Sequence, residues 1–259
     1  MKKYKFTEKT INVDGRTLYR IEALKDFNDV KKGDKGGFIE NESNLSQYNN
    51  CWVYDNAKVF GNAQIRVDAI VCEDAKIYGS AEVCENAEVY GNAKVYGNAE
   101  VFGNAYVFGN AEIYGDAKVY GNADVFGNAV VYDNAQVYGN AKVFENAEVS
   151  FDAKVYEYAK VYEYAMVQGN AKVYGNAEIR TNACIYGDAV IDSIGDYIVF
   201  KNFWSSGRSF TWTRSNDMWK VGCFYGTGEE LIKKAYKESE ISGREYERIV
   251  KYVETIKGK

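Results

Sequence analysis

The chain of 259 residues contains no histidine, so it lacks the side chain that most often serves as a general base near neutral pH. Its cysteines are five in number and form no CxxC pair, which favours free thiols over a disulfide framework. No apolar run approaches the roughly 20 residues that span a bilayer. The basic start, Met1 to Lys5, precedes no apolar signal region. We therefore expect no membrane association and a cytoplasmic location.

A six-residue phrase, most often A-x-V-Y-G-N, repeats without insertion between Cys51 and Asp192. Its aliphatic position recurs at every sixth residue from Val53 to Ile191. Ala and Val lie two residues apart and so point to one side of a strand, whereas Gly-Asn tolerates the positive φ of a tight corner. Three phrases then close a triangular coil of 18 residues. The pattern predicts a solenoid of about eight coils with Val, Ile and Ala inside.

This geometry resembles the left-handed parallel β-helix of hexapeptide-repeat proteins, whose loose motif is aliphatic, any, any, any, small, any. The segment VYGNAE at 95–100 fits that motif, as do nearly all its neighbours. The resemblance implies a mainly β protein built on a left-handed parallel β-helix. It does not fix an activity, because one fold hosts many functions.

Two further stretches carry a closer resemblance. ALKDFNDVKKGDKGGFIENESNLSQYNNCWVYDNA resembles the opening of uncharacterised hexapeptide-repeat proteins of enteric bacteria, some of which bear a transferase name. FTWTRSNDMWKVGCFYGTGEEL resembles a module that follows similar repeats in bacterial and phage proteins of unknown function. These resemblances imply a bacterial cell or a phage-infected host.

We expect three segments: a hairpin and cap at 1–52, the β-helix at 53–194, and a β-β-β-α-α module at 195–259. Asp14-Gly15 predicts the first hairpin. The Gly-rich segment 33–37 is a turn into the rod, since it lacks the spacing of a phosphate loop. In the module we expect strands at 196–201, 209–214 and 218–224, then helices capped by Thr227 and Ser242, each followed three residues later by Glu.

Charge is unevenly distributed, with net values of +2, −10 and +3 over the three segments. An acidic rod repels nucleic acid, so we expect no direct nucleic-acid binding there. The ordinary interpretation of the acidity is solubility. The alternative is that the surface imitates nucleic acid and occupies a basic groove on another protein.

The residue after each aliphatic position is usually aromatic, which predicts a column of rings on each of the three faces. Mutual stacking is one interpretation, and an oligomer or ligand surface is the other. Between Ser150 and Met166 the Gly-Asn corners become bulky. We expect a cluster there, covered either by the C-terminal segment or by a partner, and its residues are Phe151, Tyr156, Tyr158, Tyr162, Tyr164 and Met166.

The C-terminal module adds aromatic and basic residues to this candidate interaction surface, namely Trp204, Arg208, Trp212, Arg214 and Trp219. Arginine among aromatic rings can bind phosphate, a base or an acidic protein surface. The alternative is an aromatic core with solvated arginines. Cys223 has no histidine to activate it as a nucleophile.

Hexapeptide-repeat acyltransferases generally use a histidine base at a trimer interface, and this chain has neither a histidine nor an extruded loop. We therefore expect a protein that is not an enzyme, with no catalytic residue, cofactor or metal. The main hypothesis is a protein-binding solenoid, either a scaffold or a phage-encoded inhibitor of a host defence protein that binds nucleic acid. An acyltransferase-like enzyme and a glycan-binding protein are the alternatives. We expect a protein partner, and self-association into a dimer or trimer is open.

Overall fold

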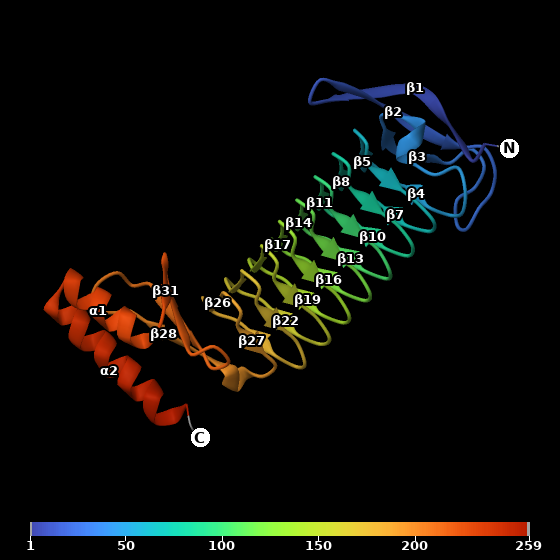
Figure 1. Ribbon diagram of the computed structural model, residues 1–259. Coiled ribbons are helices and arrows are strands. Elements are labelled where there is room, and N and C mark those ends of the chain that lie inside the picture. The colour runs from blue at the N-terminus through green and yellow to red at the C-terminus, as the bar shows by residue number, and fades with distance from the viewer. Residues whose placement is uncertain (1, 258–259) are drawn as a thin grey trace.

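The computed structural model describes residues 2–257. It shows a rod of short strands with a hairpin cap at its N-terminal end and a small sheet with two helices at its C-terminal end (Figure 1). Neither helix is long and apolar enough to cross a membrane. The rod belongs to the parallel β-helix class, as the hexad spacing predicts.

Three sheets form the sides of the rod, and within each the rod strands pair in parallel with strands three further along the chain. The first sheet contains β1 (Tyr4–Val13), β2 (Arg16–Ala23), β3 (Lys35–Ile39), β5 (Lys58–Val59), β8 (Lys76–Ile77), β11 (Lys94–Val95), β14 (Glu112–Ile113), β17 (Val130–Val131), β20 (Glu148–Val149), β23 (Met166–Val167) and β26 (Cys184–Ile185). The second contains β4 (Trp52–Val53), β7 (Ile70–Val71), β10 (Glu88–Val89), β13 (Tyr106–Val107), β16 (Asp124–Val125), β19 (Lys142–Val143), β22 (Lys160–Val161) and β25 (Glu178–Ile179). The third contains β6 (Gln64–Ile65), β9 (Glu82–Val83), β12 (Glu100–Val101), β15 (Lys118–Val119), β18 (Gln136–Val137), β21 (Lys154–Val155), β24 (Lys172–Val173) and β27 (Val190–Ile191).

The interior of the rod is the column of Val, Ile and Ala side chains that the six-residue repeat predicts. The Val or Ile of every rod strand is fully buried, and so is the Ala two residues before it from Ala57 onward. Strands β4 to β27 complete eight coils, and β3 together with the bridge between Leu45 and Ile65 begins a further one. Burial of this column at about 25 cal/mol per Å² of apolar surface is the main driving force for the rod.

The corners need a left-handed backbone, and glycine supplies it at most of them. Where another residue stands, it is often a glutamate whose carboxylate compensates for the strain. Glu157, at a φ of 58°, accepts a hydrogen bond from the N–H of Gly175 one coil later, at 3.0 Å. Glu145 does the same for the N–H of Glu163, at 2.9 Å. The acidic residues at these corners therefore have a structural role.

The aromatic columns are stacks within the rod. Neighbouring rings lie 4.7 to 5.1 Å apart with nearly parallel planes on all three sides. Lysine and acidic residues also pair between coils, as in Lys94–Glu112 at 2.6 Å and Lys118–Glu100 at 2.9 Å. Each coil therefore binds the next through rings, ions and backbone together.

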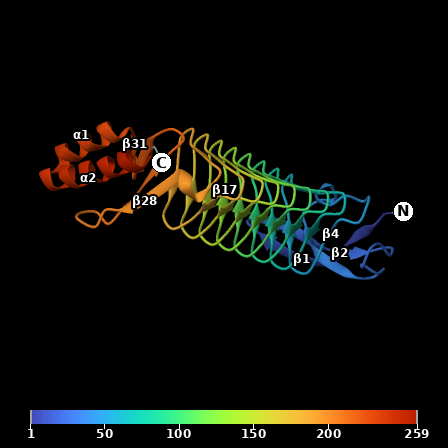
Figure 2. The same ribbon diagram turned by 90° about the horizontal axis from the view of Figure 1, so that it is seen from below.

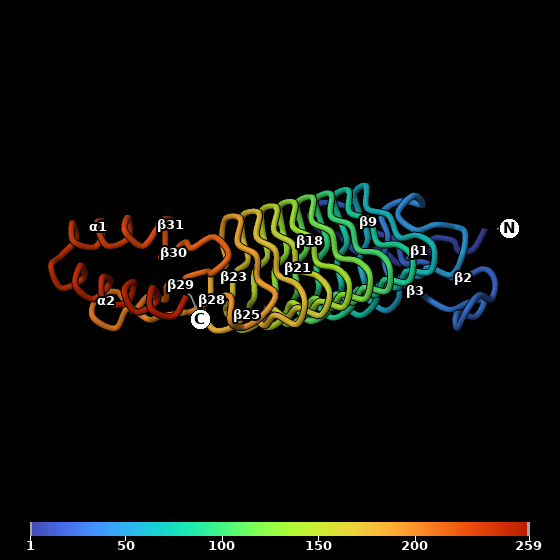
Figure 3. The backbone as a smooth tube through the Cα atoms, turned by 60° about the horizontal axis from the view of Figure 1, so that its bottom comes forward, coloured from blue at the N-terminus to red at the C-terminus, as the bar shows by residue number. Residues whose placement is uncertain are grey.

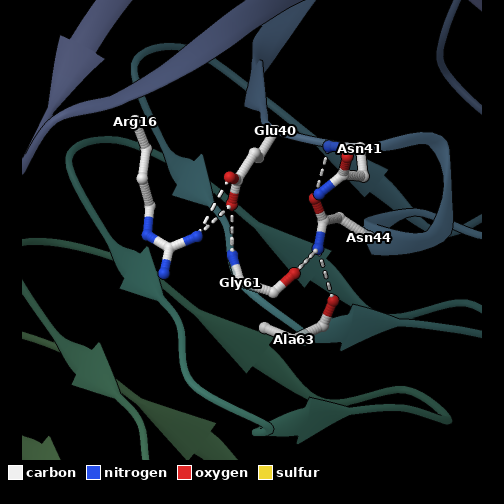
Figure 4. Close-up of polar contacts among 6 residues, drawn as sticks. All are labelled: Arg16, Glu40, Asn41, Asn44, Gly61 and Ala63. Carbon is white, nitrogen blue, oxygen red and sulfur yellow. Dashed lines mark hydrogen bonds and ion pairs between the residues drawn. The ribbon is translucent and has the colours of Figure 1, made fainter.

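The N-terminal cap covers the first coil through donors aimed at its free carbonyl groups (Figure 4). Asn44 is fully buried, and its side-chain amide donates to the carbonyl oxygens of Gly61 at 3.0 Å and Ala63 at 2.8 Å. The carboxylate of Glu40 accepts from the N–H of Gly61 at 2.7 Å and from Arg16. The predicted hairpin is confirmed, with its turn at Asp14 and Gly15.

The C-terminal module continues the rod lengthwise, with its helices beyond the small sheet (Figure 2, Figure 3). A short 3-10 helix η2 (Ile194–Asp196) leads into an antiparallel sheet, and η1 (Glu42–Asn44) is its counterpart in the N-terminal cap. The module contains β28 (Tyr197–Lys201), β29 (Ser209–Thr213), β30 (Met218–Val221), β31 (Phe224–Gly226), α1 (Gly228–Glu238) and α2 (Glu240–Ile256).

Two sequence predictions in this module are corrected. The strand expected at 218–224 is broken by Gly222, which adopts a φ of 54°, so the sheet has four strands and not three. The second helix begins earlier than expected. Ser239 is its N-cap and accepts from the N–H of Ser242, which lies inside the helix and is buried. The prediction for Thr227 is confirmed, since it forms a capping box with Glu230.

Candidate functional site

A cavity of about 460 Å³ lies at the junction between the last coils of the rod and the small sheet. We call it the junction cavity. Its volume is in the range typical of small-molecule sites. The residues that line it are Met166, Gln168, Asn182, Cys184, Lys201, Gly207, Arg208, Ser209, Lys220 and Gly222.

The rod side of the junction cavity departs from the repeated phrase. On the first sheet the outward strand position alternates among Lys, Glu and Val until β23 and β26, where Met166 and Cys184 stand. The aromatic column on the same side runs from Phe60 to Tyr132 and then stops, because Ser150 and Gln168 occupy the next two ring positions. Replacing large rings by small or flexible side chains opens space at this end of the rod.

The small sheet presents two different faces. One packs on the helices and holds Phe210, Trp212 and Trp219, each 1% exposed, in the module core. On the other face, Lys201 lies opposite Ser209 on the neighbouring strand, and Lys220 lies opposite Thr211. Because side chains alternate along a strand, these four share one face. That face meets the rod, since Thr211 accepts a hydrogen bond from the backbone of Cys184.

Three cations line the junction cavity: Lys201, Arg208 and Lys220. Within residues 2–257 no carboxylate forms an ion pair with any of them, although sixteen such pairs exist elsewhere. Lys220 lies over the ring of Tyr186 at 4.3 Å from its centroid. The guanidinium of Arg208 lies close to Gly222, where a β-carbon would approach Nη1 to 3.2 Å. The cavity is therefore positive at the end of an acidic rod and suits an anion.

The thiol in the junction cavity is not activated. Cys184 is 8% exposed, and burial raises the pKa of its thiol to about 11. At neutral pH it stays protonated, and the thiol form is a poor nucleophile. No group of His, Cys, Asp and Glu side chains within residues 2–257 has the arrangement to hold a metal ion. The cavity can bind and orient an anionic ligand, and its own residues do not form a nucleophile with a base.

The structure separates the bulky corner residues that the sequence placed together. Phe151, Tyr158 and Tyr164 lie at three successive corners of one coil, and each corner joins a different pair of sheets. Six residues carry the chain to the next side of a triangle, so these side chains surround the rod and cannot form a single patch. All three remain exposed, at 47%, 62% and 62%, so the C-terminal segment does not cover them. We call them the aromatic corners.

The other candidate residues fall into distinct environments. Tyr156 and Tyr162 are members of ring columns. Trp212 and Trp219 belong to the module core, which removes them from any surface, and Trp204 packs against that core. Arg214 is exposed, with its N–H bound to the carbonyl of Asp196. Of the eleven candidates only Met166 and Arg208 line the junction cavity, and the sequence had grouped both in the one candidate interaction surface.

Comparison with known proteins gives one informative match, and no family model matches the chain. The chain is similar to the protein named "Uncharacterized acetyltransferase YdcK" of Escherichia coli strain K12, with 41% identity over 63 residues. The match covers 21% of this chain and 19% of that protein, so it spans about a fifth of each. Together with the solenoid, it fits a hexapeptide-repeat β-helix protein.

This match contradicts the expectation that the chain is not an enzyme, because the relative is named an acetyltransferase. The expectation rested on the missing histidine. That absence removes one kind of general base. It does not remove catalysis by positioning, in which the protein holds two reactants in a productive geometry.

Proposed function

We propose that the protein binds the phosphate groups of an acyl-coenzyme A donor in the junction cavity and acts in acyl transfer. The observation that carries the proposal is the set of three cations, Lys201, Arg208 and Lys220, that line the junction cavity and form no ion pair with a carboxylate of residues 2–257. The name of the relative in Escherichia coli supports the choice of an acyl donor among phosphate-bearing ligands.

The chemistry of the three cations suits this ligand. An arginine guanidinium forms paired hydrogen bonds with phosphate oxygens, and a lysine ammonium acts as a point charge. Arg208 is the residue best placed to bind phosphate, since Gly222 leaves its guanidinium room beside the backbone. Cys184 does not take the acyl group itself, because its thiol stays protonated. Transfer then runs directly from the thioester to an acceptor held nearby.

Calorimetric titration of the intact protein with coenzyme A and acetyl-coenzyme A tests the proposal. We expect binding that weakens with added salt, because the contacts are ionic. Arg208→Ala removes a charge-assisted contact, and we expect its affinity to fall about tenfold or more. Arg214→Ala is the matched control, since Arg214 is exposed and does not line the cavity. Equal binding by both variants would contradict the proposal.

Protein binding through the aromatic corners is the second candidate function. Phe151, Tyr158 and Tyr164 replace small corner residues at one level of the rod and expose large rings, which commonly mark contact sites. The triple variant Phe151→Gly, Tyr158→Asn and Tyr164→Asn returns these corners to the common phrase. In a pulldown, the triple variant should no longer capture a protein that the parent captures. Tyr48→Asn is the control, because Tyr48 is 80% exposed but lies outside the aromatic corners, and this variant should still capture that protein. Retention by both would exclude the aromatic corners.

Inhibition through the acidic surface and glycan binding remain predictions with less support. Part of the rod's negative charge is neutralised by cross-coil pairs such as Lys142–Asp124 and Lys160–Glu178. In the ring columns each inner ring is covered on both faces by its neighbours. A sugar would therefore meet ring edges and not the flat faces on which it could stack.

A further inference from the structure

We propose that Lys3 and Cys51 form a site of oxidative cross-linking, in which the side-chain nitrogen of Lys3 bonds to the sulfur of Cys51. Lys3 Nζ lies 3.3 Å from Cys51 Sγ, and both residues are fully buried. The pair joins the start of the N-terminal cap to the residue just before β4, and β4 lies at the end of the rod away from the C-terminal module (Figure 1). The inference is independent of the proposed function.

The surroundings of Lys3 hold its nitrogen against the thiol. Nζ donates to the carbonyl oxygens of Cys51 at 2.8 Å and Tyr48 at 3.3 Å, and it lies 5.3 Å from the centroid of the Phe27 ring. Within residues 2–257 no carboxylate forms an ion pair with Lys3. Burial lowers the pKa of Lys3 and raises the pKa of the Cys51 thiol, while the charge of Lys3 and its hydrogen bond to the sulfur oppose that second rise. Cys51 therefore differs from Cys184 in having a basic nitrogen 3.3 Å away that can take the thiol proton when peroxide is attacked.

The chemistry requires a peroxide as oxidant, and its two steps balance. In the first, the Cys51 thiol and hydrogen peroxide give a sulfenic acid and water, with the sulfur oxidised by two electrons. In the second, the nitrogen lone pair of Lys3 attacks the sulfur, the S–O bond breaks, and hydroxide leaves with a proton from nitrogen as water. The product is a sulfenamide, with the same kind of S–N bond that a sulfenic acid forms when it condenses with a backbone nitrogen.

Burial directs the second step. A sulfenic acid on an exposed cysteine meets other thiols, whereas Cys51 is fully buried, and among the lysines of residues 2–257 Lys3 is the one whose nitrogen donates to its sulfur. None of the other four cysteines accepts a hydrogen bond from a lysine nitrogen within residues 2–257. Cys223 is exposed and serves as an internal indicator that the oxidant has acted.

Peptide mass mapping of the intact protein after exposure to hydrogen peroxide tests the proposal. The expected product joins the peptides of Lys3 and Cys51, weighs two hydrogens less than their sum, and separates on treatment with dithiothreitol. Fragmentation should place the bond on the Lys3 side chain. Recovery of Cys51 as a free thiol, or as a sulfinic acid on a peptide without Lys3, in a sample whose Cys223 is oxidised would overturn the proposal.

Two variants supply a second measurement. The cross-link closes a long loop between the cap and the first coil, so peroxide should raise the thermal midpoint of the parent protein. Lys3→Arg keeps the positive charge but lacks the amine, and it should show neither cross-link nor shift. Cys72→Ser should behave as the parent, since no lysine in the part of the chain that the structure describes donates a hydrogen bond to Cys72. A shift of equal size in Lys3→Arg would contradict the proposal.

Discussion

The backbone N–H of Cys184 donates a hydrogen bond to the hydroxyl of Thr211 at 2.9 Å, which joins the last coil to the small sheet. Along the rod each coil donates its N–H groups to the carbonyl oxygens of the next coil, as in Lys160 to Ala177. The last coil is therefore left with donors. Side-chain oxygens of Ser215 and Asp196 accept two more of them, from Val190 and Asp192. At the N-terminal end the first coil is left with unpaired carbonyl oxygens, and the side-chain amide of Asn44 donates hydrogen bonds to two of them.

Thr211→Val removes the acceptor for Cys184 while preserving the shape of the side chain. Both partners are buried, with Thr211 1% and Cys184 8% exposed, so the variant leaves the N–H of Cys184 without its acceptor in a buried place. We expect the free energy of unfolding to fall by about 1 to 3 kcal/mol, the usual cost of a buried unpaired donor. Urea unfolding measures it. Thr17→Val, at an exposed position of β2, should change stability little, and a similar loss in both variants would refute the capping role.

Asn44→Ala tests the other end of the rod. The variant loses two donors to the first coil and the acceptor for the N–H of Asn41 at 2.7 Å. We expect a loss of about 2 to 4 kcal/mol, because the freed groups lie buried. Asn62→Ala, at an exposed corner, is the control for chemical unfolding. If the two variants unfold at the same urea concentration, the cap does not depend on Asn44.

Glu157 separates backbone strain from hydrogen bonding at a corner. Glu157→Ala keeps the left-handed backbone and loses the bond to the N–H of Gly175. Glu157→Gly loses the same bond but relieves the strain, since glycine adopts positive φ freely. We expect the Gly variant to be more stable than the Ala variant by about 1 kcal/mol in chemical unfolding. The reverse order would contradict this explanation.

The ring columns predict a loss of stability at alkaline pH. Burial, then the Glu148 carboxylate, raises the pKa of Tyr132 to about 12. Unfolding exposes the phenol at its ordinary pKa of about 10, so above that pH the unfolded state releases its proton first. Stability should be fully present below about pH 10 and fall as the pH rises toward about 12. We expect the free energy of unfolding, measured with urea at a series of pH values, to fall less steeply with rising pH in Tyr132→Phe than in Tyr48→Phe. Identical pH slopes in the two variants would count against burial in the ring column as the cause.

The repeat made most of the fold predictable. Position within the hexad determines which residues are buried, which lie at corners and which rings meet, because nothing is inserted between Val53 and Ile191. The same period was misapplied at Phe151, Tyr158 and Tyr164, where closeness in sequence was taken for closeness in space. The strand break at Gly222 depends on one residue of left-handed backbone, which the alternation of apolar residues does not reveal.

The candidate site was less accessible to prediction. Its rod residues and its sheet residues come from segments that meet only when the module docks on the last coil. A signal was nevertheless present in the sequence. Ser150 and Gln168 interrupt the aromatic positions, and Met166 and Cys184 replace the usual charged residues beside them. Grouping every third phrase by face, and then asking where the pattern fails, would have found the rod side of the cavity.

A crystal structure of the protein soaked with coenzyme A would locate the phosphate groups of the ligand. We expect phosphate density in the junction cavity, within hydrogen-bonding distance of Arg208 and close to Lys220. Density for the ligand at any other place on the molecule, with the junction cavity filled by solvent alone, would contradict this expectation.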